Sequence, residues 1–108
     1  PRLNFEPLHH MGWFYSNMSR AEAEDCLLRI PRDGAFLIRK RNERDTFALS
    51  IRSEGDIKHY KIFRKSSKYV LADAYEFFSL EDMVSCFRNQ QFAGKTKLRY
   101  PVTPQLVE

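Results

Sequence analysis

Residues 34–41 read Gly-Ala-Phe-Leu-Ile-Arg-Lys-Arg, an apolar run that turns basic and is typical of a buried strand. Side chains in a strand alternate between two faces, so Leu37, Arg39 and Arg41 share one face. Arg39 is therefore expected among core residues. A buried guanidinium without a partner is costly, so this arginine needs either an internal carboxylate or an anionic ligand. The strand alone leaves both possibilities open.

Length and composition indicate one small globular domain. The chain has 108 residues, 43% of them hydrophobic and 14% aromatic, which suffices for a single core. No run approaches the roughly 20 apolar residues of a membrane helix, and the N-terminus lacks the apolar region of a secretory signal. We expect a soluble monomeric domain over residues 13–102, with a leader at 1–12 and a tail at 103–108.

The two cysteines indicate a reducing compartment. Cys26 and Cys86 each lie in an apolar helical pattern, and neither has metal-ligand spacing to another cysteine or histidine. We therefore predict buried free thiols, a cytoplasmic setting, and neither a metal site nor a cofactor.

Basic residues are concentrated in the middle of the chain. Ten Lys or Arg and four Asp or Glu lie between Arg39 and Lys68, and the formal net charge of the chain is +4. Such a band is compatible with nucleic acid, a membrane surface or a phosphorylated partner. Its local distribution favours a confined anionic ligand.

Two amphipathic helices are predicted, one on each side of a group of strands. The first begins after Ser19, which forms a capping box with Glu22, and ends at Pro31. The second begins after Ser79 and ends before Gly94.

Alternating patterns predict strands at 34–41, 47–52 and 57–62, with a shorter one at 69–71. Helix, antiparallel strands and helix in this order predict an α+β sandwich, in which a central antiparallel sheet is flanked by two helices. The seam between the first helix and the sheet would then collect five basic residues, namely Arg20, Arg39, Arg41, His59 and Lys61.

Five ordered landmarks resemble those of a Src-homology-2 (SH2) domain. They are Trp13-Phe14-Tyr15, Ser19-Arg20, Gly34 to Arg39, Lys58-His59-Tyr60-Lys61 and Leu98-Arg99-Tyr100-Pro101. The resemblance covers about residues 13–102. Residues 30–36 and 97–102 are similar in particular to the C-terminal SH2 domain of the phospholipase C-gamma enzymes.

The resemblance implies that Arg39 holds the phosphate of a phosphotyrosine by paired hydrogen bonds, which suits the planar fork of a guanidinium. Arg20 would flank the phosphate and the ring. Arg41 and Lys61 would add positive charge, and His59 would form part of the wall.

A groove lined by Tyr60, Leu71 and Phe92 would receive the residues that follow the phosphotyrosine. Two features depart from the family pattern. Arg41 stands where a hydroxyl residue is frequent, and the adjoining loop 42–45 carries two acids. Tyr60 replaces the small residue that close relatives have, which could narrow the groove.

The expected function is thus noncatalytic binding of a tyrosine-phosphorylated peptide or protein. The narrower resemblance implies a cytosolic phosphoinositide-specific phospholipase C as the parent protein, recruited to membrane-associated signalling complexes. There the domain would restrain the catalytic core and bind a phosphorylated linker in cis.

Four alternatives stay open from the residues. Basic strands with interleaved aromatics could bind nucleic acid, and an SH2-like surface could serve protein contacts without phosphotyrosine. A small phosphoryl-transfer or hydrolytic enzyme is disfavoured, because no nucleophile with a base is evident. Arg39 could instead pair internally with Asp45 or Glu54.

Overall fold

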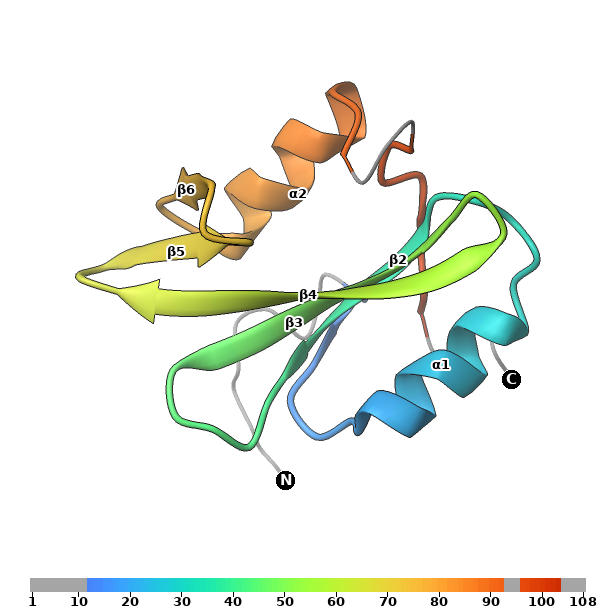
Figure 1. Ribbon diagram of the computed structural model, residues 1–108, viewed down its shortest axis with the longest axis horizontal. Coiled ribbons are helices and arrows are strands. Elements are labelled where there is room, and N and C mark those ends of the chain that lie inside the picture. Colours follow the sequence, from blue (N-terminus) through green and yellow to red (C-terminus); the bar gives the residue numbers. More distant parts are fainter. Residues whose placement is uncertain (1–11, 93–95, 104–108) are drawn as a thin grey trace.

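The computed structural model describes residues 12–92 and 96–103, in which a central sheet lies between two helices (Figure 1). The elements, in chain order, are β1 (Phe14–Tyr15), α1 (Arg20–Leu28), β2 (Ala35–Lys40), β3 (Thr46–Ser53), β4 (Asp56–Lys65), β5 (Lys68–Leu71), β6 (Tyr75–Phe77), α2 (Leu80–Asn89) and β7 (Tyr100–Pro101). The predicted α+β architecture is confirmed.

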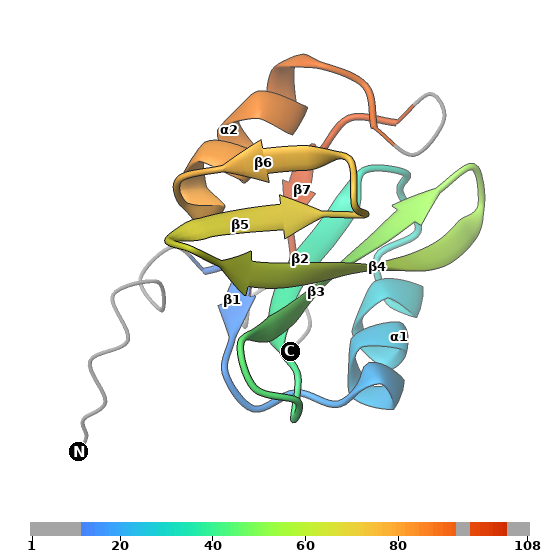
Figure 2. The same cartoon turned by 60° about the vertical axis from the view of Figure 1, so that its left-hand side comes forward.

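Strand β2 pairs with three other strands, β1, β3 and β7. Strands β2 to β6 pair antiparallel in sequence order, whereas β1 and β7 both pair parallel with β2 (Figure 2). Arg39 faces Tyr15 of β1 on one side and Ala48 of β3 on the other. Backbone pairing on both sides therefore fixes the position from which the Arg39 side chain extends.

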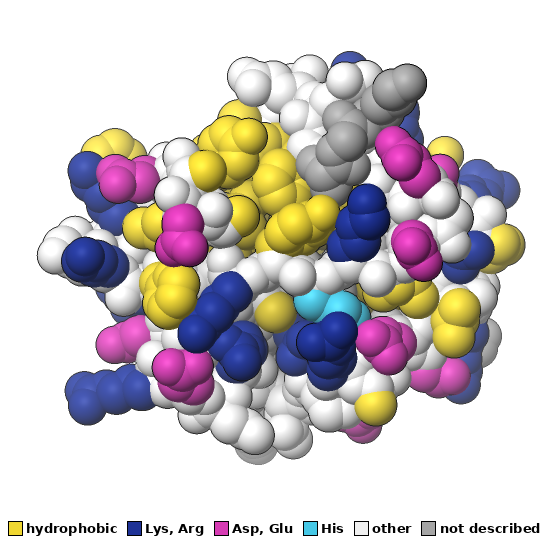
Figure 3. Space-filling view, in the orientation of Figure 1, with side chains coloured by type: hydrophobic (Ala, Val, Ile, Leu, Met, Phe, Trp, Pro, Cys, Tyr) yellow, Lys and Arg dark blue, Asp and Glu magenta, His cyan; other side chains and the backbone are white. Residues whose placement is uncertain are grey.

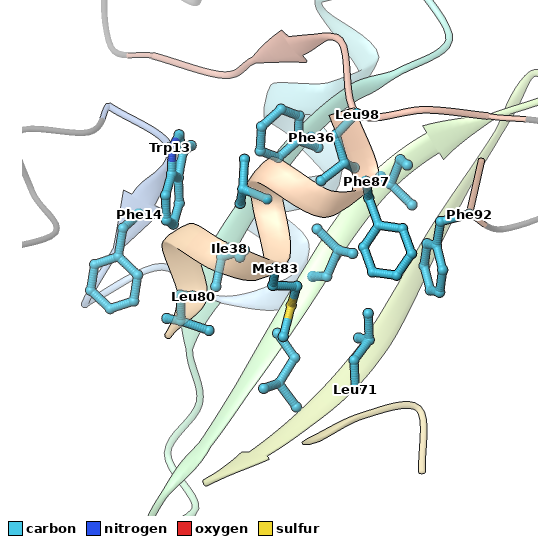
Figure 4. Close-up of a cluster of buried hydrophobic side chains, with 14 residues drawn as sticks. Trp13, Phe14, Phe36, Ile38, Leu71, Leu80, Met83, Phe87, Phe92 and Leu98 are labelled. Carbon is cyan, nitrogen blue, oxygen red and sulfur yellow. The ribbon is translucent and has the colours of Figure 1, made fainter. Parts of the chain in front are cut away.

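Two hydrophobic clusters lie on opposite faces of the sheet. Met83 and Phe87 of α2 belong to the larger cluster, with Phe36 and Ile38 of β2 (Figure 4). The smaller cluster joins α1 to the other face, where Leu37 is fully buried. The predicted alternation along β2 is confirmed, and it puts Arg39 on the face that α1 covers.

Side-chain caps start both helices where the sequence predicts. Ser19 Oγ accepts a hydrogen bond from the Glu22 backbone N–H at 3.0 Å, and the Glu22 carboxylate accepts one from the Ser19 N–H at 2.8 Å. Ser79 Oγ caps α2 through the Asp82 N–H at 3.0 Å. The first cap makes Arg20 the first residue of α1, beside the sheet.

Some expectations are modified or untested. Both cysteines are free, but each is half-buried rather than buried. The predicted leader at 1–12 and tail at 103–108 lie outside the described residues, except for Gly12 and Thr103. No helix in the described ranges has the length and apolar character needed to cross a bilayer.

Candidate functional site

A pocket of about 740 Å³ opens between α1, strands β2 to β4 and the loop that joins β2 to β3. Lys and Arg side chains gather beside a hydrophobic surface on the face shown in Figure 3. The pocket is lined by all five basic residues that the sequence analysis selected, Arg20, Arg39, Arg41, His59 and Lys61. Their roles toward a ligand stay predictions.

Arg39 is the most buried charged group of the pocket, with 6% of its surface exposed. Its Nε donates to Ser50 Oγ at 3.3 Å, and its Nη2 lies 3.5 Å from His59 Nδ1. Within the described residues it belongs to no ion pair, so the alternative of a partner at Asp45 or Glu54 is not observed.

The surroundings of Arg39 disfavour its positive charge. Burial lowers the pKa of Arg39, and the neighbouring cations Arg41 and Arg20 lower it further, against a smaller opposite effect of Glu24. A guanidinium stays protonated even so. The pocket therefore holds a desolvated cation that a bound anion would stabilise.

A chain of hydrogen bonds runs from Arg39 to the surface. Ser50 Oγ lies 2.8 Å from His59 Nδ1, and His59 Nε2 lies 2.9 Å from Glu24 Oε2. Because Arg39 donates to Ser50, the Ser50 hydroxyl can donate to Nδ1, and Nε2–H can donate to Glu24. This direction requires a neutral His59 with its hydrogen on Nε2.

The pKa shifts agree with a neutral ring. Burial lowers the pKa of His59, and its hydrogen bond to Glu24 offsets this only in part, so the Glu24–His59 contact is a hydrogen bond from a neutral ring. The hydrogen bond from His59 lowers the pKa of Glu24. Glu24, which the sequence analysis missed, thus orients His59.

A second carboxylate stands on the opposite side of the pocket. Glu43, in the loop between β2 and β3, lies 3.5 Å from Arg41 Nη1 and 3.3 Å from Lys61 Nζ. The acids of this loop were noted as a departure from the family pattern. The structure shows that one of them pairs with two of the predicted phosphate-binding residues.

The surface where the peptide groove was predicted differs in part from the prediction. Tyr60 and Phe92 form an edge-to-face pair with ring centroids 4.9 Å apart, and Tyr75, which is 43% exposed, lies 5.9 Å from Phe92. Leu71 has no exposed surface, because it belongs to the larger core cluster. Leu71 is therefore not at the surface, whereas Tyr75, which was not predicted, is exposed beside Phe92.

The described part of the chain has no group of three or more His, Cys, Asp or Glu side chains that could hold a metal ion. Ser50 Oγ and His59 Nδ1 lie next to Arg39 as acceptors, while the cations Arg20, Arg41 and Lys61 line the same pocket. The carboxylates of Glu24 and Glu43 lie at its sides. This arrangement suits reversible binding of an anion.

Comparisons with known proteins agree with this geometry. The SH2 domain family model matches residues 13–87. The chain is 46% identical over its 108 residues to human 1-phosphatidylinositol 4,5-bisphosphate phosphodiesterase gamma-2, of which it spans 8%. It is 35% identical over 89 residues to the mouse dual adapter for phosphotyrosine and 3-phosphotyrosine and 3-phosphoinositide, covering 81% of this chain and 31% of the adapter.

A solved structure shows the same fold. The SH2 domain of the Monosiga brevicollis CRK/CRKL homologue superposes with a TM-score of 0.77 at 27% identity, covering 85% of this chain and 86% of that domain. The family match extends from the first described strand through most of α2 and so includes every basic residue of the pocket. The chain therefore belongs to the SH2 domain family.

Proposed function

We propose that this domain binds phosphotyrosine in the pocket described above, with Arg39 at its base holding the phosphate. SH2 domains are noncatalytic modules that bind tyrosine-phosphorylated proteins. The observation that supports the assignment is a guanidinium with 6% exposure and no ion pair among the described residues. Ser50 accepts from Nε, and each terminal nitrogen keeps an N–H for a phosphate oxygen, with Nη2 also 3.5 Å from His59 Nδ1.

Depth would make the site selective for phosphotyrosine. A buried Arg39 can be reached by a phosphate on a long, rigid aromatic side chain, whereas phosphoserine is too short to bring its phosphate to the base. Arg20, at the start of α1, would contact the ring and the phosphate. Arg41 and Lys61 would contribute charge from the side, and His59 would hold Arg39 through Ser50.

The aromatic surface next to the pocket would choose among peptides. Tyr60, Phe92 and Tyr75 form a continuous set of edge-to-face contacts with exposed area at Tyr75. Residues that follow the phosphotyrosine would lie on this surface as the peptide crosses the sheet.

We also infer a parent protein. The chain is 46% identical along its full length to a phospholipase C-gamma, although it spans 8% of that relative. This supports a role as the C-terminal SH2 domain of a cytoplasmic phosphoinositide-specific phospholipase C. The domain would restrain catalysis, recruit the enzyme to membrane-associated signalling complexes and bind a phosphorylated linker in cis.

Calorimetric titration tests the binding function. Wild type should bind a tyrosine-phosphorylated peptide, and it should bind the unphosphorylated peptide and a phosphoserine version far more weakly. Arg39→Met should lose most of the affinity. The matched control is Arg64→Met, which removes an exposed arginine at the far end of β4 that does not line the pocket.

Two results would contradict the proposal. One is equal binding of the phosphopeptide by wild type and Arg39→Met. The other is salt-sensitive RNA binding by a folded domain that does not bind the phosphopeptide, which would favour a nucleic-acid function. The cis arrangement is tested separately in the full-length parent, where tyrosine phosphorylation of the linker should protect the pocket from an added phosphopeptide.

A further inference from the structure

Four of the five predicted phosphotyrosine-binding residues already have a carboxylate partner. Glu24 lies 3.5 Å from Arg20 Nε and 2.9 Å from His59 Nε2. Glu43 contacts the other two, Arg41 and Lys61. Among the described residues Arg39 alone of the five has no such partner. The pocket is thus flanked by two carboxylates that already contact groups expected to bind a phosphate.

The two carboxylates differ in how firmly they are held. Glu24 extends from a helix and accepts a short hydrogen bond from His59, whose side chain is 7% exposed. Glu43 extends from a loop, and its side chain is 59% exposed. Rotation about its own side-chain bonds can carry the Glu43 carboxylate into solvent.

The backbone at Glu43 is fixed independently of its carboxylate. Its carbonyl accepts hydrogen bonds from Thr46 Oγ1 at 2.6 Å and from Lys40 Nζ at 3.2 Å. Departure of the carboxylate therefore leaves the loop in place. The exchange of one anion for another needs no refolding of the pocket.

The contact between Glu43 and Arg41 is incomplete. Arg41 Nη1 is buried and makes no hydrogen bond, although the Glu43 carboxylate lies 3.5 Å away. A buried donor without an acceptor is unfavourable. A phosphate oxygen placed closer than the carboxylate would satisfy this donor, so Arg41 favours the exchange.

We propose that Glu43 is an affinity-determining residue that occupies the outer part of the anion site and must leave Arg41 and Lys61 when phosphate binds. The inference rests on the proposed function, because it concerns the same pocket. Arg39 and Glu24 keep their positions, and the exchange takes place on the loop side alone.

The test compares Glu43→Gln with Glu76→Gln. Glu76 is a matched control because its side chain is 61% exposed and pairs with Lys68 at 3.5 Å, on β6 and away from the pocket. Both substitutions remove one negative charge, but Glu43→Gln removes two ion pairs and Glu76→Gln removes one. The ligands are a phosphotyrosine peptide and N-acetyl-phosphotyrosine amide, which carries no flanking residues.

Glu43→Gln should bind both ligands roughly three- to tenfold more tightly than wild type, because an exposed ion pair is weak and two are removed. The gain should be equal for the two ligands and should shrink at high salt. Glu76→Gln should change affinity by less than about twofold. On titration of wild type, the carboxyl-carbon NMR resonance of Glu43 should move while that of Glu76 stays.

The contrary outcomes separate the two proposals. If wild type binds the phosphotyrosine ligands and Glu43→Gln binds them equally or more weakly, the inference about Glu43 is wrong and the proposed function stands. If neither protein binds either ligand while both remain folded, the proposed function fails and the inference fails with it.

Discussion

Replacement of Arg39 by methionine should remove most of the phosphopeptide affinity and, at the same time, make the domain more stable. Methionine keeps the aliphatic length of the arginine stem and removes the charge. A residue that held the fold together would show the opposite stability effect. The two measurements together therefore distinguish a ligand-binding arginine from a structural one.

The expected magnitudes follow from the surroundings of Arg39. Burial of an ion costs several kcal/mol, and here Arg20 and Arg41 add repulsion. The hydrogen bonds of the Arg39 guanidinium to Ser50 and His59 offset about 1.5 to 3 kcal/mol of this cost. Loss of Arg39 should thus raise the free energy of unfolding by about 1 kcal/mol, or Tm by about 4 to 8 °C.

The affinity for the phosphopeptide should fall, although the free energy of unfolding rises. Truncation of one partner of a buried charge pair costs about 2 to 5 kcal/mol, which corresponds to about 30-fold to several thousand-fold in Kd. Arg39→Lys should retain part of the affinity, because an ammonium keeps the charge and loses the two-pronged geometry.

Urea unfolding and calorimetric titration of the same preparations provide the assay. The reasoning would be refuted by an Arg39→Met protein that unfolds about 3 kcal/mol more easily, as expected when a buried ion pair is broken. Retention of phosphopeptide binding by this variant would refute it equally.

Three further predictions concern single residues. Gly34 has φ +96°, and an added Cβ would lie 2.9 Å from Arg99 Cβ. Gly34→Ala should therefore lower the free energy of unfolding, measured in urea, by about 2 to 4 kcal/mol. An unchanged midpoint of urea unfolding would contradict this. Burial raises the pKa of Tyr15 from 10.0 to about 12, and its hydroxyl donates to the Val102 carbonyl at 2.6 Å. The stability that this shift contributes is complete below pH 10.0 and is lost as the pH rises toward about 12, so the difference in unfolding free energy between wild type and Tyr15→Phe should shrink over that interval rather than stay constant. The hydrogen-bond chain requires the Nε2–H tautomer of His59 at neutral pH, so an Nδ1–H ring in nitrogen NMR would contradict it. Because the pKa of His59 is lowered, the ring should titrate below 6.5, and stability should be lost as the pH falls.

Local periodicity and capping residues were sufficient to predict most of the fold. Ser19 and Ser79 are the N-caps after which the two helices begin. The period of two along β2 places Leu37 on the opposite face of the sheet from Phe36 and Ile38. The short strands β1 and β7 could not be found in this way. Each has two residues, and its pairing with β2 depends on contacts between distant parts of the chain.

In the candidate site, too, the residues set by local patterns could be predicted, whereas pairings between distant residues could not. The basic residues could be selected from motifs, because strand alternation and the helix start are local features. Glu24 could be read only as a helix neighbour of Arg20, since its other partner, His59, lies 35 residues away. The pairing of Glu43 with Lys61 depends on the register of β3 with β4.

Leu71 shows a limit of pattern-based reasoning about surfaces. Alternation predicts which face of β5 it occupies, but not whether other parts of the chain cover that face. Its cross-strand neighbour Ile62 is fully buried, so Leu71 is covered as well. The exposure of a face depends on what the rest of the chain places over it.

The most direct test of the central claim is a crystal structure of the domain with a phosphotyrosine peptide. The account predicts that both terminal nitrogens of Arg39 lie within hydrogen-bond distance of two phosphate oxygens, while Nε remains on Ser50 and the Glu43 carboxylate has left Lys61. A phosphate bound elsewhere, with Arg39 in contact with protein groups alone, would contradict it.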